Sequence, residues 1–345
     1  MNHFLIRERP SIAFEKRWNS LLDDADYASH YTSPAIFNEP YMRRRPLFAL
    51  FVGSNERFDA VLTGFSDPLL ISSGATFSPN FCVRRGADLA VISSSIDSAL
   101  LELATGERKF ISVYSWLAIP DMRKVGYREH KGHSPLGTIL LDLRKPAEQI
   151  FKEFSETRRN KIRRAIKAGV VVTELDIDRE FDEYYDIYSH WCKFKGIELI
   201  PYDVQRETLS LQGNRLLLAA RHDGKLVGVS IFRFRRPGII EYAANVSRRE
   251  DSRVRQNDLL LWRAIEWASA KGDLRCFSLA GAHFFLQKFG GTIYPTYRYS
   301  KDLSFLRRRH AKESLMILGM NVYRSLPDRV KQVVRRLAGR DEESD

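Results

Sequence analysis

Hydrophobic and polar positions in the second half of the chain predict a hairpin followed by alternating strands and helices. Apolar residues at 215–221 and 226–234 flank Asp223-Gly224, a pair that suits a two-residue turn with positive φ. Helical periodicity is found at 146–168, 178–195 and 258–270, and a short helix is expected at 284–289. The remaining apolar runs predict strands at 170–174, 239–246, 275–279 and 293–299.

The first half of the chain repeats this order. A hairpin is expected at 47–52 and 58–65, a helix at 88–103, a helical turn at 120–124, and strands at 109–116 and 138–143. The central helices are offset by 170 residues and the strands that follow them by 166, which indicates internal duplication. We therefore predict an α/β (α+β) fold of two similar domains, 1–140 and 141–305, each a mostly antiparallel mixed sheet flanked by helices.

Composition places the protein among ordinary globular chains. It has 345 residues, of which 44% are hydrophobic and 28% charged, enough for two domains with genuine cores. The three cysteines lie far apart without a CxxC pair, so we expect neither a disulfide framework nor a metal site. No secretory signal or run of 18 apolar residues is seen, which predicts a cytoplasmic protein that does not span a membrane.

Positive charge is concentrated in two segments. The net charge is +12, and residues 152–168 hold seven cations against two acids while residues 306–340 hold ten against two. Concentrated positive charge attracts polyanions, which points to phosphate-bearing ligands, RNA or an anionic membrane surface, but a solvated helix face is the simpler alternative. Residues 306–345 are expected to form a basic helical tail, divided at Pro327, with a disordered acidic end at 341–345.

Two stretches carry a family resemblance. The strand and helix order of each half resembles the GNAT acyltransferase fold, in which two neighbouring strands splay to admit an acyl donor. The segments LDLRKPAEQIFKEFSETRRNKIRRAIKAGVVV and FFLQKFGGTIYPTYRY are similar to the Fem family of peptidoglycan bridge aminoacyltransferases and its FemAB-like relatives, over about residues 10–305. The resemblance implies tandem GNAT domains and an amide-forming transferase. Its donor is an ester carried by aminoacyl-tRNA in the best known members.

The sequence departs from the family at one catalytic position. The family motif has a lysine after the phenylalanine that corresponds to Phe285, where this chain has Leu286, and Lys288 lies two residues later. Two helical residues rotate a side chain by about 200°, so Lys288 does not simply replace that lysine. The long helical arm of some members is also missing, as in the armless ones.

Amide formation requires a base for the amine and donors for the oxyanion. Glu241, on the third strand of the second sheet, is the candidate base, and His283 is an alternative. Lys288, with the amides of Gly290-Gly291, is the candidate oxyanion donor, beside Phe285. Each also has a simpler interpretation as an exposed strand, helix-start or surface residue.

The loop before the helix at 258–270 bears on the acyl donor. Coenzyme A sites of GNAT enzymes usually have a glycine-rich loop there, whereas residues 247–258 contain no glycine, and we expect Asp258 to repel a phosphate. This favours a tRNA-borne donor over acyl-CoA without deciding between them; no bound cofactor is expected. The candidate donor-binding residues are Arg248, Arg249, Arg253, Arg255 and Asn257, the last as the expected helix N-cap.

The acceptor side has two groups of candidates. Arg159, Arg163 and Lys167 recur at four-residue spacing, which predicts a cationic face for a diphosphate or the tRNA acceptor stem. Further candidates for the acceptor cleft are Trp191, Tyr202, Tyr242 and Arg298. A small-molecule, nucleotide-linked or lipid-linked acceptor is expected, with tRNA as a candidate partner and DNA not expected. In the tail, Leu315, Leu318 and Val322 among basic residues are typical of a helix lying on anionic lipid at the inner face of a membrane, although the tail could equally dock on a domain.

The leading hypothesis is a FemAB-like N-acyl or aminoacyl transferase that moves an activated acyl group to an amine of a cell-envelope precursor or amino sugar. Two alternatives remain. One is an acyl-CoA-dependent N-acyltransferase of surface polysaccharide sugars, and the other is a non-catalytic GNAT pair that binds RNA or an anionic surface.

Overall fold

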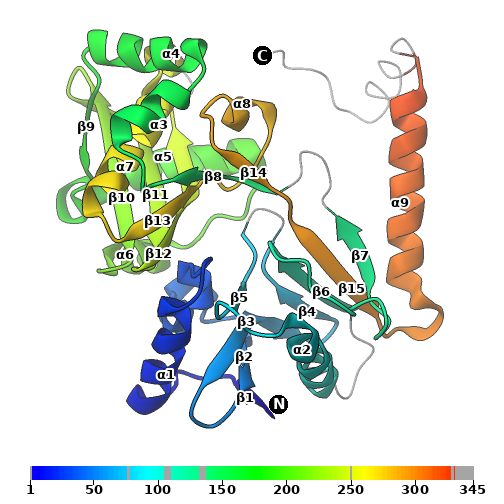
Figure 1. Ribbon diagram of the computed structural model, residues 1–345. Helices are drawn as coiled ribbons and strands as arrows, with labels where there is room; N and C mark the ends of the chain where they lie inside the picture. Colours follow the sequence, from blue (N-terminus) through cyan, green and yellow to red (C-terminus); the bar gives the residue numbers. More distant parts are fainter. Residues whose placement is uncertain are drawn as a thin grey trace.

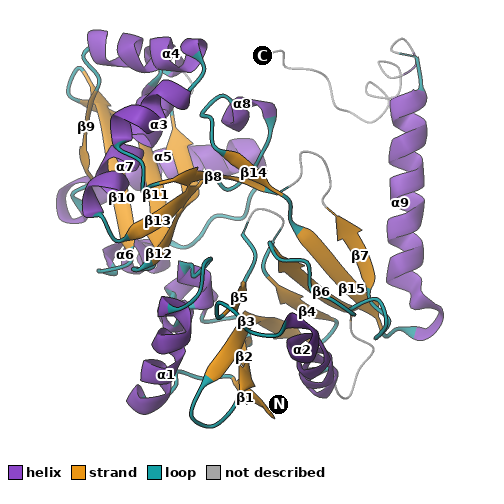
Figure 2. Cartoon of the chain, viewed as in Figure 1, coloured by secondary structure: helices purple, strands orange, loops and turns teal. Residues whose placement is uncertain are grey.

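A computed structural model describes residues 2–75, 78–104, 110–131, 137–248, 251–327 and 330. Two β-sheets, each flanked by helices, form an N-terminal and a C-terminal domain in contact with one another (Figure 1; Figure 2). The helix α9 (Arg308–Ser325) follows the last strand and projects beside the N-terminal sheet. No described helix is long and apolar enough to cross a membrane.

The N-terminal sheet has the strand order β1-β2-β3-β4-β6-β15-β7, with β5 beside β3. Two helices, α1 (Ile12–Asp23) and α2 (Leu89–Leu103), pack against it, and three 3-10 turns lie between α1 and β2: η1 (His30–Thr32), η2 (Pro34–Asn38) and η3 (Pro40–Met42). The strands are β1 (Asn2–Ile6), β2 (Leu47–Gly53), β3 (Phe58–Asp67), β4 (Leu70–Ser73), β5 (Phe81–Val83), β6 (Phe110–Ser115), β7 (Arg128–Lys131) and β15 (Tyr297–Asp302).

The C-terminal sheet has the order β14-β8-β13-β12-β11-β10-β9. Its strands are β8 (Thr138–Asp142), β9 (Val171–Glu174), β10 (Arg215–His222), β11 (Lys225–Phe234), β12 (Gly238–Ser247), β13 (Leu274–Ser278) and β14 (Thr292–Tyr294). One face is covered by α3 (Ala147–Glu153), α4 (Glu156–Lys167) and α7 (Gln256–Lys271), and the other by α5 (Ile177–Lys195) and α6 (Tyr202–Ser210). The turn η4 (Ser252–Val254) precedes α7, α8 (Phe284–Gln287) lies between β13 and β14, and η5 (Phe305–Arg307) precedes α9.

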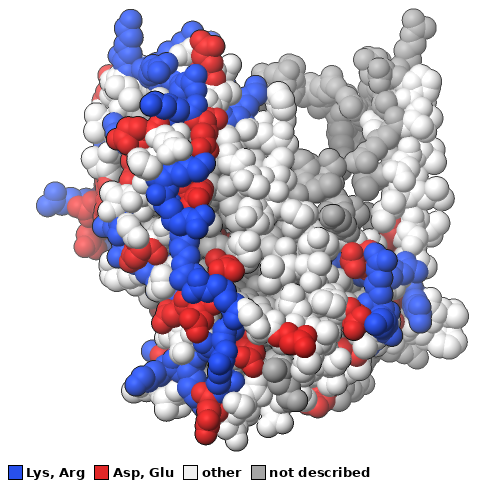
Figure 3. Space-filling view, viewed as in Figure 1, with Lys and Arg blue, Asp and Glu red and all other residues white. Residues whose placement is uncertain are grey.

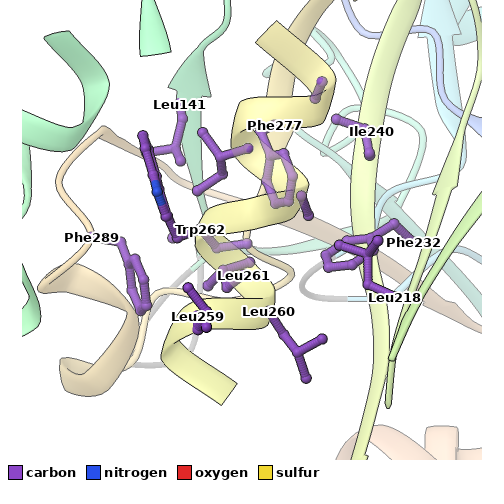
Figure 4. Packing of buried hydrophobic residues seen from close by; sticks show 14 of the residues in the cluster. Leu141, Leu218, Phe232, Ile240, Leu259, Leu260, Leu261, Trp262, Phe277 and Phe289 are labelled. Atoms are coloured by element: carbon purple, nitrogen blue, oxygen red, sulfur yellow. The ribbon is translucent and has the colours of Figure 1, made fainter. Parts of the chain in front are cut away.

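The largest core of the C-terminal domain lies between α7 and the sheet. Leu260 and Trp262 of α7 belong to one buried cluster with Phe232, Phe277 and Leu141 of the strands (Figure 4). Complete burial of a large apolar side chain contributes roughly 1.5–3 kcal/mol. This packing holds α7, and with it the loop before the helix, in a fixed place over the sheet.

Each domain contributes one strand to the other domain's sheet. β8 follows the N-terminal domain but pairs with β13 and β14, and β15 follows the C-terminal strands but pairs with β6 and β7. The predicted strand 138–143 was therefore wrongly assigned to the first sheet, whose own strand β7 was missed. The predicted strand 293–299 is two strands in different sheets, separated at Pro295. Consequently the division expected at residues 140 and 141 does not follow the sheets.

Two local predictions differ in detail. The helix expected at 146–168 is two helices, because the side chain of Ser155 accepts a hydrogen bond from the Arg158 amide and starts α4 anew. Asn257 is not the N-cap of α7, since that helix begins at Gln256 after Arg255, which has a φ of 61°. The hairpin turn at Asp223-Gly224 is confirmed, with positive φ at both residues.

Glycine at position 291 allows the chain after α8 to pass close to β8. Its φ is +81°, and an added Cβ would lie 2.6 Å from Leu141 Cδ2 and 2.8 Å from the Leu140 carbonyl oxygen. Gly169 has nearly the same φ, +80°, with nothing within 4 Å of an added Cβ. The two positions therefore share a backbone requirement but differ in the available space.

We predict that Gly291→Ala destabilises the protein more than Gly169→Ala. Both substitutions incur about 1–2 kcal/mol for a left-handed residue with a side chain. Overpacking against β8 adds about 1–3 kcal/mol at Gly291 alone. Urea unfolding of both variants measures the difference, and equal losses of stability would contradict the close approach.

Candidate active site

The C-terminal sheet splits between β12 and β13. Parallel pairing runs from Gly238 beside Leu274 to Glu241 beside Ser278, and β12 then continues to Ser247 with only β11 as its partner. A bulge at residue 243 interrupts the β11–β12 pairing just beyond Glu241. The first sheet has a similar split. There β4 pairs in parallel with β6, and the next strand along the chain, β5, pairs with β3. Glu241 thus lies where the two strands separate.

The carboxyl group of Glu241 is buried and incompletely satisfied. Its residue is 2% exposed, and its Oε2 atom has no hydrogen-bond partner among the described residues. Burial raises the pKa of Glu241 to about 7, although the hydrogen bond from Ser78 and the positive charge of Arg233 act in the opposite direction. A carboxyl group with a pKa near neutrality can accept a proton from an amine or return it to a leaving group.

Ser78 reaches this carboxyl group from the N-terminal domain. The half-buried Ser78 lies between β4 and β5, and its hydroxyl donates a hydrogen bond of 2.7 Å to Glu241 Oε1. The candidate base is therefore contacted by residues of both domains. No sequence signal identified Ser78, because the contact joins residues 163 positions apart across two domains.

A buried charge cluster lies on the same face of β11 and β12. Glu39 of the N-terminal domain is fully buried, with its Oε1 atom 2.6 Å from Arg215 Nη2 and 2.8 Å from His30 Nε2. Arg233, the cross-strand partner of Glu241, has a guanidinium nitrogen 3.7 Å from Glu39 Oε2. Burial alone would raise the pKa of Glu39, but the hydrogen bond from His30 and the two arginines hold it at about 2. Burial lowers the pKa of His30.

An aromatic cavity of about 160 Å³ opens beside this cluster, between α5, α6 and β12. Its lining includes the expected acceptor residue Trp191 together with Tyr41, Tyr184, Tyr188, Arg233 and Ala244.

The other expected acceptor residues lie elsewhere. The Tyr202 hydroxyl donates to Asp182 at the surface, and Tyr242 packs against Phe232 on the opposite face of β12 from Glu241. Arg298 lies on β15 in the N-terminal sheet, where it donates to Ser112 and Glu313. It lines a separate pocket of about 610 Å³ together with Ser72, Tyr114, Arg309, Lys312 and Glu313.

The α8 segment is organised by a buried ion pair that the sequence analysis missed. Arg158 of α4 is 1% exposed and donates to the Asp258 carboxylate and to the carbonyl oxygen of Phe285. Its guanidinium also lies 4.0 Å from the centre of the Phe285 ring. The charge of Asp258, which was expected to repel a phosphate at the start of α7, is therefore paired with Arg158.

The predicted catalytic residues of α8 have structural contacts. His283 precedes the first turn of α8, where its carbonyl oxygen accepts from the Leu286 amide, and Leu286 is buried in the core. Lys288 Nζ lies 4.4 Å from the centre of the Phe284 ring. No hydrogen bond or ion pair joins Lys288 to Glu241, both of which lie in the described part of the chain. The predicted base and oxyanion donor therefore have no direct polar contact with each other.

Lys288 instead belongs to a group of cations at the start of α7. Burial lowers the pKa of Lys161, and the positive charges of Arg158, Arg255 and Lys288 lower it further. This mutual influence places the four cations near one another, beside the first turn of α7, where backbone amides already favour an anion.

Some of the other predicted donor-binding residues are exposed, and others are bonded to side chains of the protein. Arg253 is exposed, whereas Arg248 is held by carboxylate oxygens of Asp186 and Glu183 on α5 at 3.5 and 3.9 Å. Asn257 donates to Ser247 Oγ. Arg249 lies outside the described residues.

The expected cationic face of α4 is divided. Arg159 donates to the carbonyl oxygens of Lys152 and Phe154, so it closes the end of α3. Arg163 bonds to Asn160 and is exposed, as is Lys167. Lysine and arginine side chains gather over α4 at the top of the C-terminal domain (Figure 3). Only Arg163 and Lys167 of the three are free to meet a polyanion.

The described residues contain no group of three histidine, cysteine or acidic side chains that could hold a metal ion. The three cysteines, Cys82, Cys192 and Cys276, are free.

Residues 152–289 match the family model of the acetyltransferase (GNAT) domain, a range that runs from the end of α3 to just beyond α8. This match supports the predicted class, an acyltransferase. No curated protein matches the chain.

Solved structures with the same arrangement span both domains. FemX is similar over 88% of this chain and 97% of its own, with a TM-score of 0.64 and 11% identity. A tandem GNAT protein from the clavulanic acid biosynthesis pathway is similar over 88% and 99%, with a TM-score of 0.51 and 14% identity. The C-terminal domain of a putative lysylphosphatidylglycerol synthetase from Agrobacterium fabrum is similar over 89% and 98%, with a TM-score of 0.58 and 13% identity. The predicted FemAB-like tandem GNAT fold is thereby confirmed.

The raised pKa of Glu241 predicts a pH-dependent stability. A buried carboxyl group that prefers its proton stabilises the folded state at low pH, and this contribution is lost as pH rises from about 4.5 through about 7. One pKa unit corresponds to about 1.4 kcal/mol, so the loss is on the order of 3 kcal/mol. Glu241→Gln is therefore expected to be more stable than the unmodified protein at pH 8 and to lack this part of the pH dependence.

Urea unfolding from pH 5 to pH 8 measures this effect. Glu174→Gln, at an exposed position on β9, is the control and should follow the unmodified protein. A Glu241→Gln variant with an unchanged stability curve would contradict the raised pKa.

Proposed function

We propose that the protein is an N-acyltransferase whose reaction centre lies at Glu241, where β12 and β13 separate and Ser78 of the N-terminal domain meets the C-terminal domain. The observation that carries this proposal is the buried carboxyl group with a pKa of about 7 at the split of a GNAT sheet. The acyl acceptor is an amine of a cell-envelope precursor or an amino sugar.

Glu241 acts as the general base in this proposal. Because the carboxyl group is buried while Ser78 is half-buried, the amine passes its proton to Ser78 Oγ as the hydroxyl proton moves to Glu241 Oε1. Loss of this proton turns the ammonium group of the acceptor into a neutral amine, which attacks the carbonyl carbon of the donor and forms the C–N bond. The C–S or C–O bond of the donor then breaks, and the thiol or alcohol leaves with a second proton from the attacking nitrogen. In this proposal the N-terminal domain takes part in the proton transfer through Ser78.

The donor's phosphates are proposed to lie at the start of α7. Lys161, Arg255 and Lys288 supply positive charge there, and pairing of Asp258 with Arg158 removes the negative charge that counted against coenzyme A. Aminoacyl-tRNA and acyl-CoA both carry phosphate, so both remain candidate donors. The structural similarity to FemX and to the tandem GNAT protein from the clavulanic acid biosynthesis pathway supports acyl transfer without distinguishing the two donors.

Peripheral contact with an anionic membrane is a separate part of the proposal. On α9, Leu315, Leu318 and Val322 are exposed on one side, and Arg308, Arg309 and Lys312 lie in its first turns. A helix of this kind suits an enzyme whose acceptor is linked to a lipid.

Purified protein should transfer an acyl group to a diverse set of amines from acyl-CoA, from aminoacyl-tRNA or from both. We predict that Glu241→Gln lowers kcat by a factor of about 10²–10⁴, the usual contribution of a general base. Ser78→Ala should lower kcat by less, because water can take the place of the hydroxyl. The rate should rise with pH through about 7 in the unmodified enzyme.

Lys225→Ala is the matched control, since this cation is exposed at the start of β11 and is not one of the candidate site residues. It is expected to leave kcat with acyl-CoA unchanged. Absence of transfer from either donor, with stabilisation of the protein by RNA alone, would instead favour the non-catalytic alternative. The buried Leu286, at the position of the family lysine, is the observation behind that alternative.

A further inference from the structure

The aromatic cavity beside β12 is small and chemically distinctive. Tyr184, Tyr188 and Trp191 of α5 form one wall, Ala244 of β12 another, and Tyr41 of the N-terminal domain a third. Among the residues that line the cavity, Arg233 is the charged one. The cavity therefore combines flat apolar walls with one guanidinium group.

The volume of the cavity limits what it can hold. It measures about 160 Å³. An engineered apolar cavity of about 150 Å³ binds benzene. A group the size of a six-membered ring, or a branched aliphatic side chain, is thus the largest apolar group that fits.

The charge of Arg233 is only partly compensated within the protein. Glu39 is closest to Arg215, at 2.6 Å, and lies 3.7 Å from Arg233. Arg233 Nη1 donates to the hydroxyl of Tyr31 at 2.7 Å, and its Nε atom has no hydrogen-bond partner among the described residues. His30 adds no charge when neutral, and Glu241 adds none while it is protonated, below about pH 7, so Glu39 alone then faces two arginines. A buried unpaired charge is costly, and an anion in the cavity would relieve the imbalance.

Glu241 lies directly across the strand pair from Arg233. The two residues are Cα partners of β11 and β12, so their side chains project from the same face of the sheet, and such neighbours have Cβ atoms about 4.5–5.5 Å apart. Arg233 lines the cavity, and Glu241 lies beside it just outside the lining, so an anion-binding group and a cation-binding group are neighbours at the edge of the cavity. This spacing suits a ligand that carries a carboxylate and an amine on the same or adjacent carbon atoms.

We propose that the aromatic cavity binds an amino acid, or an amino-acid unit with a free carboxylate, as the acyl acceptor: the carboxylate on Arg233, a ring-sized apolar side chain against the tyrosines, and the amine toward Glu241. This inference rests on the proposed function, because it assigns the amine the role of nucleophile. It narrows the acceptor to a cell-envelope precursor whose amine lies beside a carboxylate, and it excludes an amino sugar without one.

Calorimetric titration of the full chain, without any acyl donor, tests the proposal. L-phenylalanine should bind. Phenethylamine, which lacks the carboxylate, should bind at least 10-fold more weakly, as expected for loss of a hydrogen bond to a charged group. Glycine, which lacks the apolar side chain, should also bind at least 10-fold more weakly. Equal affinity for phenylalanine and phenethylamine, or no binding of phenylalanine, would overturn the proposal.

Two variants locate the site. Ala244→Leu fills the cavity while leaving Arg233 and Glu39 in place, and it should weaken phenylalanine binding at least 10-fold. Ala311→Leu, the same substitution on the exposed side of α9, is the control and should bind as the unmodified protein does. Arg233→Lys keeps the positive charge but lacks the planar guanidinium that binds a carboxylate through two N–H groups, so it should also weaken phenylalanine binding. Undiminished binding by Ala244→Leu would place the amino acid elsewhere and overturn the proposal.

The outcomes separate this inference from the proposed function. Phenylalanine binding without acyl transfer to any amine would contradict the proposed function and leave the binding site intact. Acyl transfer to amines that lack a carboxylate, without binding of phenylalanine, would support the proposed function and overturn this inference.

Discussion

The buried carboxylate of Glu39 is the interaction on which the relation between the two domains depends. It comes from the N-terminal domain, yet its closest cation is Arg215 of the C-terminal sheet, and Arg233 lies on its other side. A buried carboxylate separated from these arginines would be an uncompensated charge, typically a cost of about 3–5 kcal/mol. The domains are therefore held where Ser78 can reach Glu241 and where Tyr41 can close the aromatic cavity.

The helices and hairpins that depend on local sequence patterns could be predicted from the sequence. The Asp223-Gly224 hairpin, the helices at 178–195 and 258–270 and the repeated order of elements all rest on contacts between near neighbours in the chain. The exchange of β8 and β15 could not be predicted in this way, because each strand has the same alternation of residues whichever sheet it joins. Sequence pattern indicates a strand but not its partner.

In the candidate site, too, residues set by local sequence could be predicted, and residues defined by distant contacts could not. Glu241 could be selected because it is a carboxylate on the strand at the expected split of the sheet. Ser78, Arg158 and Arg233 could not, since their importance comes from partners more than 90 residues away or in another domain. The pairing of Asp258 could not be predicted for the same reason, since its partner Arg158 lies 100 residues earlier in the chain.

The strand exchange also has a consequence for synthesis of the protein on the ribosome. Domains usually fold in order as the chain emerges. Here the first sheet lacks an interior strand until Tyr297–Asp302 has been made, so β6 and β7 have no partner between them during most of translation. The domain that begins first is completed last, and its open sheet edge must be protected from other nascent chains in the meantime.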